Sequence, residues 1–271
     1  MSDTSGLPSP DDTASVDAMT DLVHRVKGTV MPVLEVDLQP GQKVVSEGGE
    51  LSWMTDTVKM STSTSGAGQS GVLGVLKRAV AGGTIFMTEY HVEGGPGTVA
   101  FATKMPGEIR PVAIGPGREY MVSRHGFLAG TENVTLSIGF QRKLGAGVFS
   151  GNGFILQRLA GQGVTWVGLS GEIIEYRLQP GETIHVHPGH IGIFDASVSF
   201  DIEMVKGIKN MLFGADSIFL VRMTGPGVVW LQTLPLPNLA HALSPYLERE
   251  GGGHQSTPNS PGSLLGGLLG N

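Results

Sequence analysis

The chain of 271 residues contains no cysteine. This excludes disulfide bonds, thiolate nucleophiles, cysteine-ligated zinc and iron–sulfur clusters. Charged residues make up only 15% of the chain, and the formal net charge at pH 7 is -6. An acidic chain without a cluster of Lys and Arg argues against a nucleic-acid partner, because basic side chains at phosphates supply that affinity.

Long hydrophobic runs are missing as well. No stretch of about 18 apolar residues occurs, so we predict no transmembrane segment, although peripheral membrane association stays open. The N-terminus carries acidic residues and prolines where a secretory signal would carry basic residues and an apolar run. We therefore expect a cytoplasmic protein.

Glycine, by contrast, is abundant, with 42 residues, and hydrophobic residues make up 40% of the chain. This composition is typical of a globular domain made of many short strands and turns. We predict a single β domain over residues 21–246. Residues 1–20 and 247–271 are predicted to be a disordered acidic tail and a disordered Gly/Ser/Pro linker, respectively. Four leucines in 263–270 form a peptide that could dock on a protein partner.

Two sequence elements recur three times. The first is a Pro-Gly turn at Gly41, Gly117 and Gly181, each followed by a strand-like run that is broken near its middle by glycine (43–54, 119–130 and 183–194). We interpret each run as a strand, a tight bend and a second strand.

The second element is a hairpin with a glycine-rich turn, found at 86–101, 154–167 and 219–231. Gly97, Gly163 and Gly227 occupy equivalent turn positions, and Pro226 belongs to the third turn. The two elements recur in step, which predicts a mainly β, pseudo-threefold, sandwich- or prism-like domain of three antiparallel units. Trp166, Trp230 and Phe101 are expected to pack around the pseudo-threefold axis, with ligand stacking as the alternative.

Two segments show helical rather than strand periodicity. In 72–83 and 204–214, apolar residues recur at helical spacing with basic residues opposite them. We predict a short helix at each place, at a sheet edge.

These phrases together resemble the altered inheritance of mitochondria protein 24 family, whose fold is likened to the tryptophan RNA-binding attenuator protein. The resemblance covers roughly residues 28–235 and rests on 33–49, 171–194 and 212–233, with Thr224-Gly225-Pro226-Gly227 as its most specific part. It implies a pseudo-threefold β fold, a tendency to oligomerise and no established catalytic activity. Mitochondrial members are linked to inner-membrane organisation, but the acidic N-terminus of this chain is unlike a transit peptide.

The most suggestive chemical cluster is His185, His187 and His190. Two histidines at i and i+2 of a strand face the same way, and the third follows a Pro-Gly bend, so the three could hold a divalent metal as in cupins. The cupin pattern requires a Glu shortly afterwards, whereas the next acid is Asp195. The structural alternative places His185 and His187 on a solvated strand face and lets His190 cap the bend.

Other catalytic patterns are missing, since the chain has neither a Gly-x-Ser-x-Gly elbow nor a Walker motif. We therefore predict no catalytic residues, no cofactor and a non-catalytic oligomeric scaffold or binding protein that supports a larger or membrane-associated complex. The alternative is a cupin-like metal-dependent enzyme centred on the three histidines. An RNA-binding ring is a third class, opposed by the charge. Unpaired sheet edges predict a homo-oligomer.

Overall fold

The computed structural model describes residues 10, 13–62, 85, 87–142, 153–204, 219–243 and 246. Within them the chain is mainly β, and the three predicted units are present as three successive groups of six strands. The first unit comprises β2 (Val33–Leu38), β3 (Lys43–Glu47), β4 (Trp53–Met54), β5 (Val58–Thr62), β6 (Met87–Val92) and β7 (Gly97–Ala102). The second comprises β8 (Gly107–Ile114), β9 (Tyr120–Ser123), β10 (Phe127–Thr131), β11 (Val134–Arg142), β12 (Phe154–Gly161) and β13 (Gly163–Ser170). The third comprises β14 (Ile173–Leu178), β15 (Thr183–Val186), β16 (Ile191–Asp195), β17 (Ser199–Met204), β18 (Phe219–Thr224) and β19 (Gly227–Gln232).

Each unit pairs its strands by the same scheme. The first strand pairs with the sixth, as in β2·β7, β8·β13 and β14·β19. The second and fourth strands flank the fifth, and the third pairs with the sixth. A unit is therefore two three-stranded halves, one built from its first, third and sixth strands and the other from its second, fourth and fifth.

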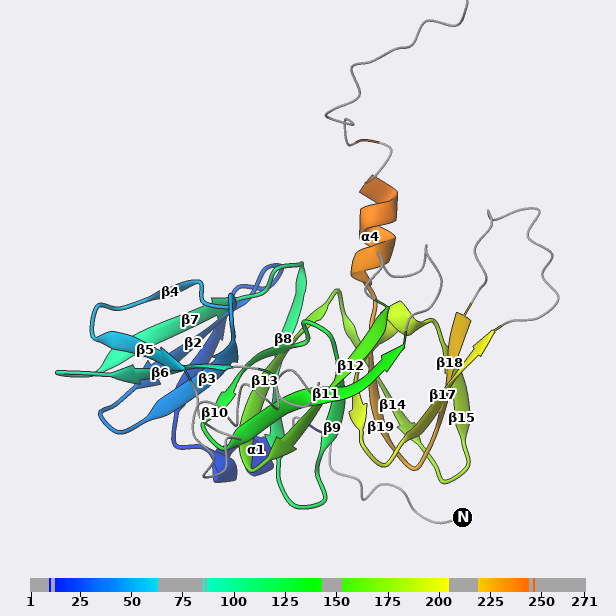
Figure 1. Ribbon diagram of the computed structural model, residues 1–271, viewed down its shortest axis with the longest axis horizontal. Coiled ribbons are helices and arrows are strands. Elements are labelled where there is room, and N and C mark those ends of the chain that lie inside the picture. The colour runs from blue at the N-terminus through cyan, green and yellow to red at the C-terminus, as the bar shows by residue number, and fades with distance from the viewer. Residues whose placement is uncertain are drawn as a thin grey trace, which may run out of the picture.

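Neighbouring units join these halves into larger sheets. In the described residues the strand orders are β1-β2-β7-β4 for the first sheet, β5-β6-β3-β10-β13-β8 for the second, β11-β12-β9-β16-β19-β14 for the third and β15-β18-β17 for the fourth. The additional strand β1 (Val23–Lys27) flanks β2. The predicted mainly β, sandwich-like fold is confirmed, with the units following one another in a row (Figure 1).

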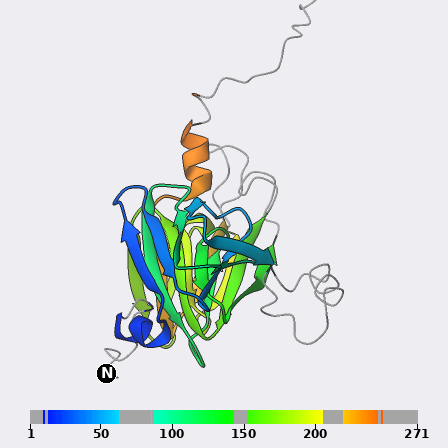
Figure 2. The same ribbon diagram turned by 90° about the vertical axis from the view of Figure 1, so that its left-hand side faces the viewer.

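The sheets stack in layers, and a separate apolar core fills each gap between them. Strand alternation makes this possible, because successive residues of one strand face the two neighbouring layers. In β9, for example, Tyr120 and Val122 belong to the core between the second and third sheets, whereas Met121 belongs to the core between the third and fourth. The view along the row shows the layers overlying one another (Figure 2).

The tryptophans illustrate this layering. Trp166 is buried in the core between the first and second sheets, together with Phe101, and Trp230 in the core between the second and third. They pack in successive layers and not around one shared axis.

The recurring glycines lie at equivalent turns. Gly41, Gly117 and Gly181 have φ values of +91°, +75° and +81°, and the residue after each donates its backbone N–H to the carbonyl three residues earlier. An L-residue with a Cβ strains such a turn, which is why glycine recurs.

Gly97, Gly163 and Gly227 open the sixth strand of each unit, where the backbone passes close to the end of the third strand. The following residue donates its N–H to a side chain at the same place in every unit, namely Thr98 to Thr55, Val164 to Thr131 and Val228 to Asp195. The Gly225–Pro226 peptide in the third of these turns is cis.

The N-terminal segment differs from the expectation. Residues 13–19, assigned from composition to a disordered tail, form the helix α1 (Thr13–Met19), which packs on β8 and β13. Its Val16 is only 2% exposed and joins the first core. One buried side chain is enough to dock a short helix, and the average composition of residues 1–20 does not reveal a single buried residue. The helices predicted at 72–83 and 204–214 lie outside the described residues, apart from Met204, which ends β17.

Candidate functional site

The repeated bends between the second and third strands gather around one cavity. Ser123 to Gly126 in the second unit and Pro188 and Gly189 in the third line it, together with Glu50 from the first. Residues at or just after the ends of the sixth strands, among them Lys104 and Ser170, line it as well. The cavity has a volume of about 380 Å³, within the range of roughly 300–1,000 Å³ typical of ligand sites. We call it the bend pocket.

Much of the lining of the bend pocket is apolar. This apolar wall consists of Leu128, Phe154, Ile155, Leu169, Ile191 and Leu236. Four of these side chains are buried in the three cores, so the packing of the sheets fixes their positions. They are Leu128, Phe154, Leu169 and Ile191. Leu236, at the start of α4 (Leu236–Leu243), is 50% exposed and lies at the rim.

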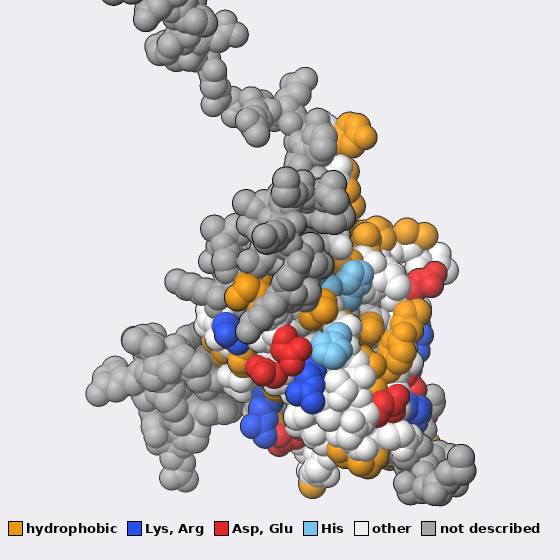
Figure 3. Space-filling view, turned by 90° about the vertical axis from the view of Figure 1, so that its right-hand side faces the viewer, with side chains coloured by type: hydrophobic (Ala, Val, Ile, Leu, Met, Phe, Trp, Pro, Cys, Tyr) orange, Lys and Arg blue, Asp and Glu red, His pale blue; other side chains and the backbone are white. Residues whose placement is uncertain are grey.

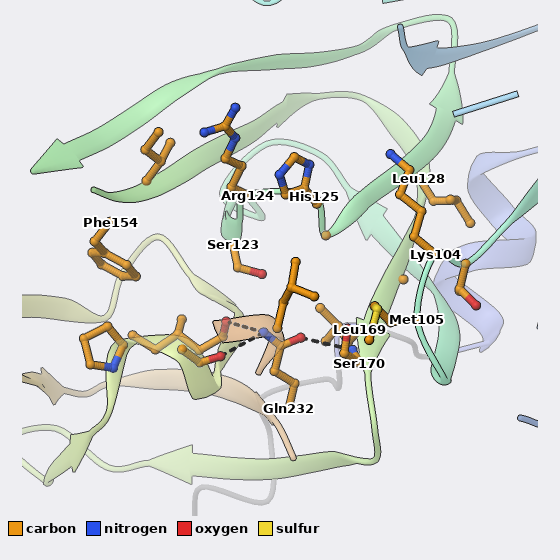
Figure 4. Close-up of a pocket in the computed structure, with 18 of the residues that line it drawn as sticks. Lys104, Met105, Ser123, Arg124, His125, Leu128, Phe154, Leu169, Ser170 and Gln232 are labelled. Carbon is orange, nitrogen blue, oxygen red and sulfur yellow. Dashed lines mark hydrogen bonds between the residues drawn. The ribbon is translucent and has the colours of Figure 1, made fainter. Parts of the chain in front are cut away.

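The lining also carries basic groups. Lys104, Arg124 and His125 lie along one edge of the bend pocket, across from Gln232 and Ser170 (Figure 4). The Lys104 ammonium pairs with the Glu50 carboxylate. Burial lowers the pKa of His125, and the positive charges of Arg124 and Lys104 lower this pKa further. Lys104 and Glu50 offset each other, so Arg124 leaves this edge with a net positive charge when His125 is neutral.

His125 has an unusual backbone conformation. Its φ is +69°, at the third position of a turn that Gly126 closes by donating its N–H to the Ser123 carbonyl at 2.9 Å. The equivalent residue of the first unit is Gly49, with φ of +90°. A side chain at such a position costs about 1–3 kcal/mol, and strain of this kind concentrates at functional sites. The strained turn holds the imidazole at the pocket edge.

Gln232 fixes the floor of the bend pocket. Its side-chain amide donates to the backbone carbonyl of Gly189 at 3.0 Å and to that of Ile191 at 3.4 Å, while its Oε1 accepts the Ser170 N–H at 3.0 Å. The third bend is thereby tied to the connection between β13 and β14. The floor is consequently held in shape without a ligand.

Of the three predicted histidines, His187 and His190 pack edge to face with 6.0 Å between their ring centroids, whereas His185 lies apart from them. His185 lies on β15 and faces Glu203 at 3.4 Å, while the Nδ1 of His187 accepts the Gly189 N–H at 3.3 Å. The Nδ1 of His190 contacts the Gln232 carbonyl at 2.8 Å. Among the described residues, no group of three or more His, Asp or Glu side chains is placed to hold a metal ion. It is His187, rather than His190, whose ring caps the bend as the N-cap of the short helix η1 (Pro188–His190).

The pocket histidine makes stability depend on pH. Burial lowers the pKa of both His125 and His187 from 6.5 in the folded protein, so the unfolded chain binds these protons first as pH falls. Stability should be full above pH 6.5 and decrease below it, until the folded imidazoles also protonate. Urea midpoints measured across this range should show a weaker decrease in His125→Asn, since Asn tolerates the positive φ. An unchanged pH dependence in that variant would contradict the assignment.

Comparisons with known proteins decide the family. The sequence profile of the family described as "Mitochondrial biogenesis AIM24" matches residues 24–234, which contain all three units. This chain belongs to the AIM24 family. It is 25% identical over 222 residues to an uncharacterised protein of Streptococcus pyogenes serotype M6, covering 80% of this chain and 87% of that protein. A crystal structure of a Streptococcus pyogenes protein has the same fold, with a TM-score of 0.65 and 23% identity over 83% of this chain and all of the other.

For this AIM24-family chain, none of the described helices has the length and hydrophobicity required to cross a bilayer. The family resemblance inferred from the repeated motifs is thus confirmed, and these relatives assign no activity to the bend pocket.

Proposed function

We propose that this protein is a non-catalytic oligomeric scaffold that binds an amphipathic anion, an apolar chain with a carboxylate or phosphate head, in the bend pocket. The observation that carries the proposal is the presence of both apolar and basic side chains in the lining of this one cavity. A lipid-like ligand fits a role in organising a larger, membrane-associated complex.

The apolar wall supplies the affinity. Burying one methylene group contributes about 0.8 kcal/mol, so a chain that lies along Leu128, Leu169 and Leu236 gains affinity with each carbon until the wall is covered. The wall is preformed, which reduces the ordering cost of binding.

The basic edge supplies the selectivity for a head group. Arg124 and Lys104 attract an anion, and a bound anion would favour the protonated form of His125. Lys104 is paired with Glu50, and Gln232 uses its amide to hold the backbone. Because these two side chains are already engaged in an ion pair and in hydrogen bonds, they are suited to binding a ligand and not to transferring a proton.

Calorimetric titration with octyl, decyl and dodecyl phosphate, and with the matching carboxylates, tests this proposal on the full chain. Affinity should rise about tenfold for each added pair of methylenes while the wall has room. Arg124→Glu should weaken binding about tenfold, because it reverses a charge at the edge. The control Arg222→Glu changes an exposed arginine on β18 that is not part of the pocket lining and should bind like the wild type.

A second pair of variants tests the apolar wall. Leu236→Glu places a negative charge at the pocket rim, whereas Leu243→Glu places it on the same helix at a residue outside the lining that is 47% exposed. We expect only the first to lose binding. An affinity that does not change with the length of the alkyl chain would refute the bend pocket as the site. An affinity that falls equally in both variants would refute it too.

A further inference from the structure

The joints between units follow one rule. The second strand of a unit pairs antiparallel with the third strand of the next unit, as β3 with β10 and β9 with β16. The registers also agree. Val45 pairs with Gly130 in the first joint, and the equivalent Met121 pairs with Phe194 in the second.

At each end of the row of units, one strand of the kind that forms these joints has no joint partner within the described part of the chain. They are β4, the third strand of the first unit, and β15, the second strand of the last unit. Within the described part of the chain each is the edge of its sheet, and the two lie at opposite ends of the molecule (Figure 1). The Thr55 N–H at the end of β4 bonds to the Thr98 carbonyl at 2.9 Å, so the neighbouring Met54 directs its backbone groups to the open side.

The incomplete sheets complement each other. The second and third sheets each join two half-sheets, whereas the first has only the β2-β7-β4 half, extended by β1, and the fourth has only the β15-β18-β17 half. Pairing β15 with β4 would give the order β17-β18-β15-β4-β7-β2. This is the order of the two complete sheets, β5-β6-β3-β10-β13-β8 and β11-β12-β9-β16-β19-β14.

An exposed apolar side chain marks the same gap. Met60 on β5 pairs with Tyr90, and its counterpart Leu136 on β11 pairs with Leu159 at the equivalent place. Leu136 is 1% exposed, whereas Met60 is 53% exposed. Ile85, ahead of β6, packs against the core that holds Leu136, and its N–H bonds to the Leu136 carbonyl at 3.3 Å. The corresponding cover over Met60 would come from a half-sheet placed beyond β4.

The outer face of the fourth sheet does not resemble a buried layer. Viewed from that end, the molecule shows charged and histidine side chains interspersed with hydrophobic ones (Figure 3). His185 on this face stands where the inner strands have Val45 and Met121, which are 0% and 8% exposed. Pairing of β15 with β4 would place this face over β5, so the match to an internal joint rests on the open edge and not on the character of the face.

We propose that a second copy of this chain adds its β15 to β4, repeating the internal joint between molecules. The shared register aligns Trp53 with Val186, Met54 with His185 and Thr55 with Ile184 of the second copy. Because the two surfaces differ, the contact is head-to-tail and propagates to a ring or a filament. The inference specifies the oligomeric part of the proposed function and does not depend on the pocket ligand.

Cysteine cross-linking tests the register, and the natural chain contributes no thiol of its own. We would mix Met54→Cys protein with His185→Cys protein and oxidise with copper phenanthroline. Facing strand residues lie within the roughly 4.4–6.8 Å between Cα atoms that a disulfide spans, so the mixture should give a cross-linked dimer. The double variant should give a ladder of larger species.

Three controls make this result specific. Either single variant alone should stay uncross-linked, and a Met54→Cys dimer formed by itself would show a β4-to-β4 contact and overturn the proposal. Ile184→Cys in place of His185→Cys turns the thiol to the opposite face and should not cross-link to Met54→Cys. Light scattering of the full wild-type chain should show an assembly that Met54→Pro, which removes the outward N–H, abolishes. A monomeric wild type would also overturn the proposal, whatever the pocket binds.

Discussion

Gly163→Ala is expected to destabilise the fold by about 2–6 kcal/mol, a large fraction of the roughly 5–15 kcal/mol that stabilises a typical domain. An added Cβ would lie 1.9 Å from the Thr131 Oγ1, at a residue whose φ is +143°. The free-energy costs of the strained backbone and of the overpacked contact therefore add. The displaced Thr131 hydroxyl is also the acceptor for the Val164 N–H at 3.1 Å, so the substitution disturbs a bond found in all three units.

Gly181→Ala is the matched control. This glycine has φ of +81°, but no atom lies within 4 Å of the added Cβ. The cost should be limited to backbone strain of about 1–2 kcal/mol. Urea denaturation followed by tryptophan fluorescence measures both variants. Equal losses of stability would show that the close approach to Thr131 is unimportant.

Trp166→Ala should cost about 3–5 kcal/mol, because it empties a large site in a core that cannot collapse around it. Trp166 is 0% exposed and packs edge-on against His24 of β1, with 5.0 Å between ring centroids. The loss should therefore loosen the first sheet from the second.

Trp53→Ala removes the same side chain from a different environment. Trp53 pairs with Ala100 on the outer side of the first sheet and is 51% exposed. Its removal should cost less than about 1 kcal/mol. Thermal or urea unfolding of the two variants should separate them clearly, and similar midpoints would contradict the layered cores.

The threefold repeat could be predicted from the sequence, because the residues that a turn requires lie next to one another in the chain. A Pro-Gly turn with positive φ at Gly41, Gly117 and Gly181 leaves the same mark at each occurrence. The hairpin turns at Gly97, Gly163 and Gly227 do likewise, since side chains at or just after the end of the third strand leave no room for a Cβ there. These signals led to three antiparallel units and to the AIM24 family.

Sequence patterns did not show how the units stack, because that depends on pairing between distant strands such as β3 and β10. The bend pocket was missed for a similar reason, since it forms only where bends from three units meet. One signal was available. Aligning the first two bends places His125 opposite Gly49, and a histidine where the turn requires a positive φ marks an unusual residue. The histidines at 185, 187 and 190 were more conspicuous in the sequence, yet each has a local contact, with Glu203, the Gly189 N–H and the Gln232 carbonyl respectively.

Isotope-edited NMR of the full chain with ¹³C-labelled decyl phosphate tests most directly that the bend pocket binds an amphipathic anion. The alkyl chain should show NOEs to the methyl groups of Leu128, Leu169 and Leu236, which line the apolar wall. The phosphate should shift the His125 ring signals and raise the pKa of this imidazole. Saturable binding of decyl phosphate without NOEs to these three leucines would contradict the account. NOEs only to residues elsewhere on the surface would contradict it as well.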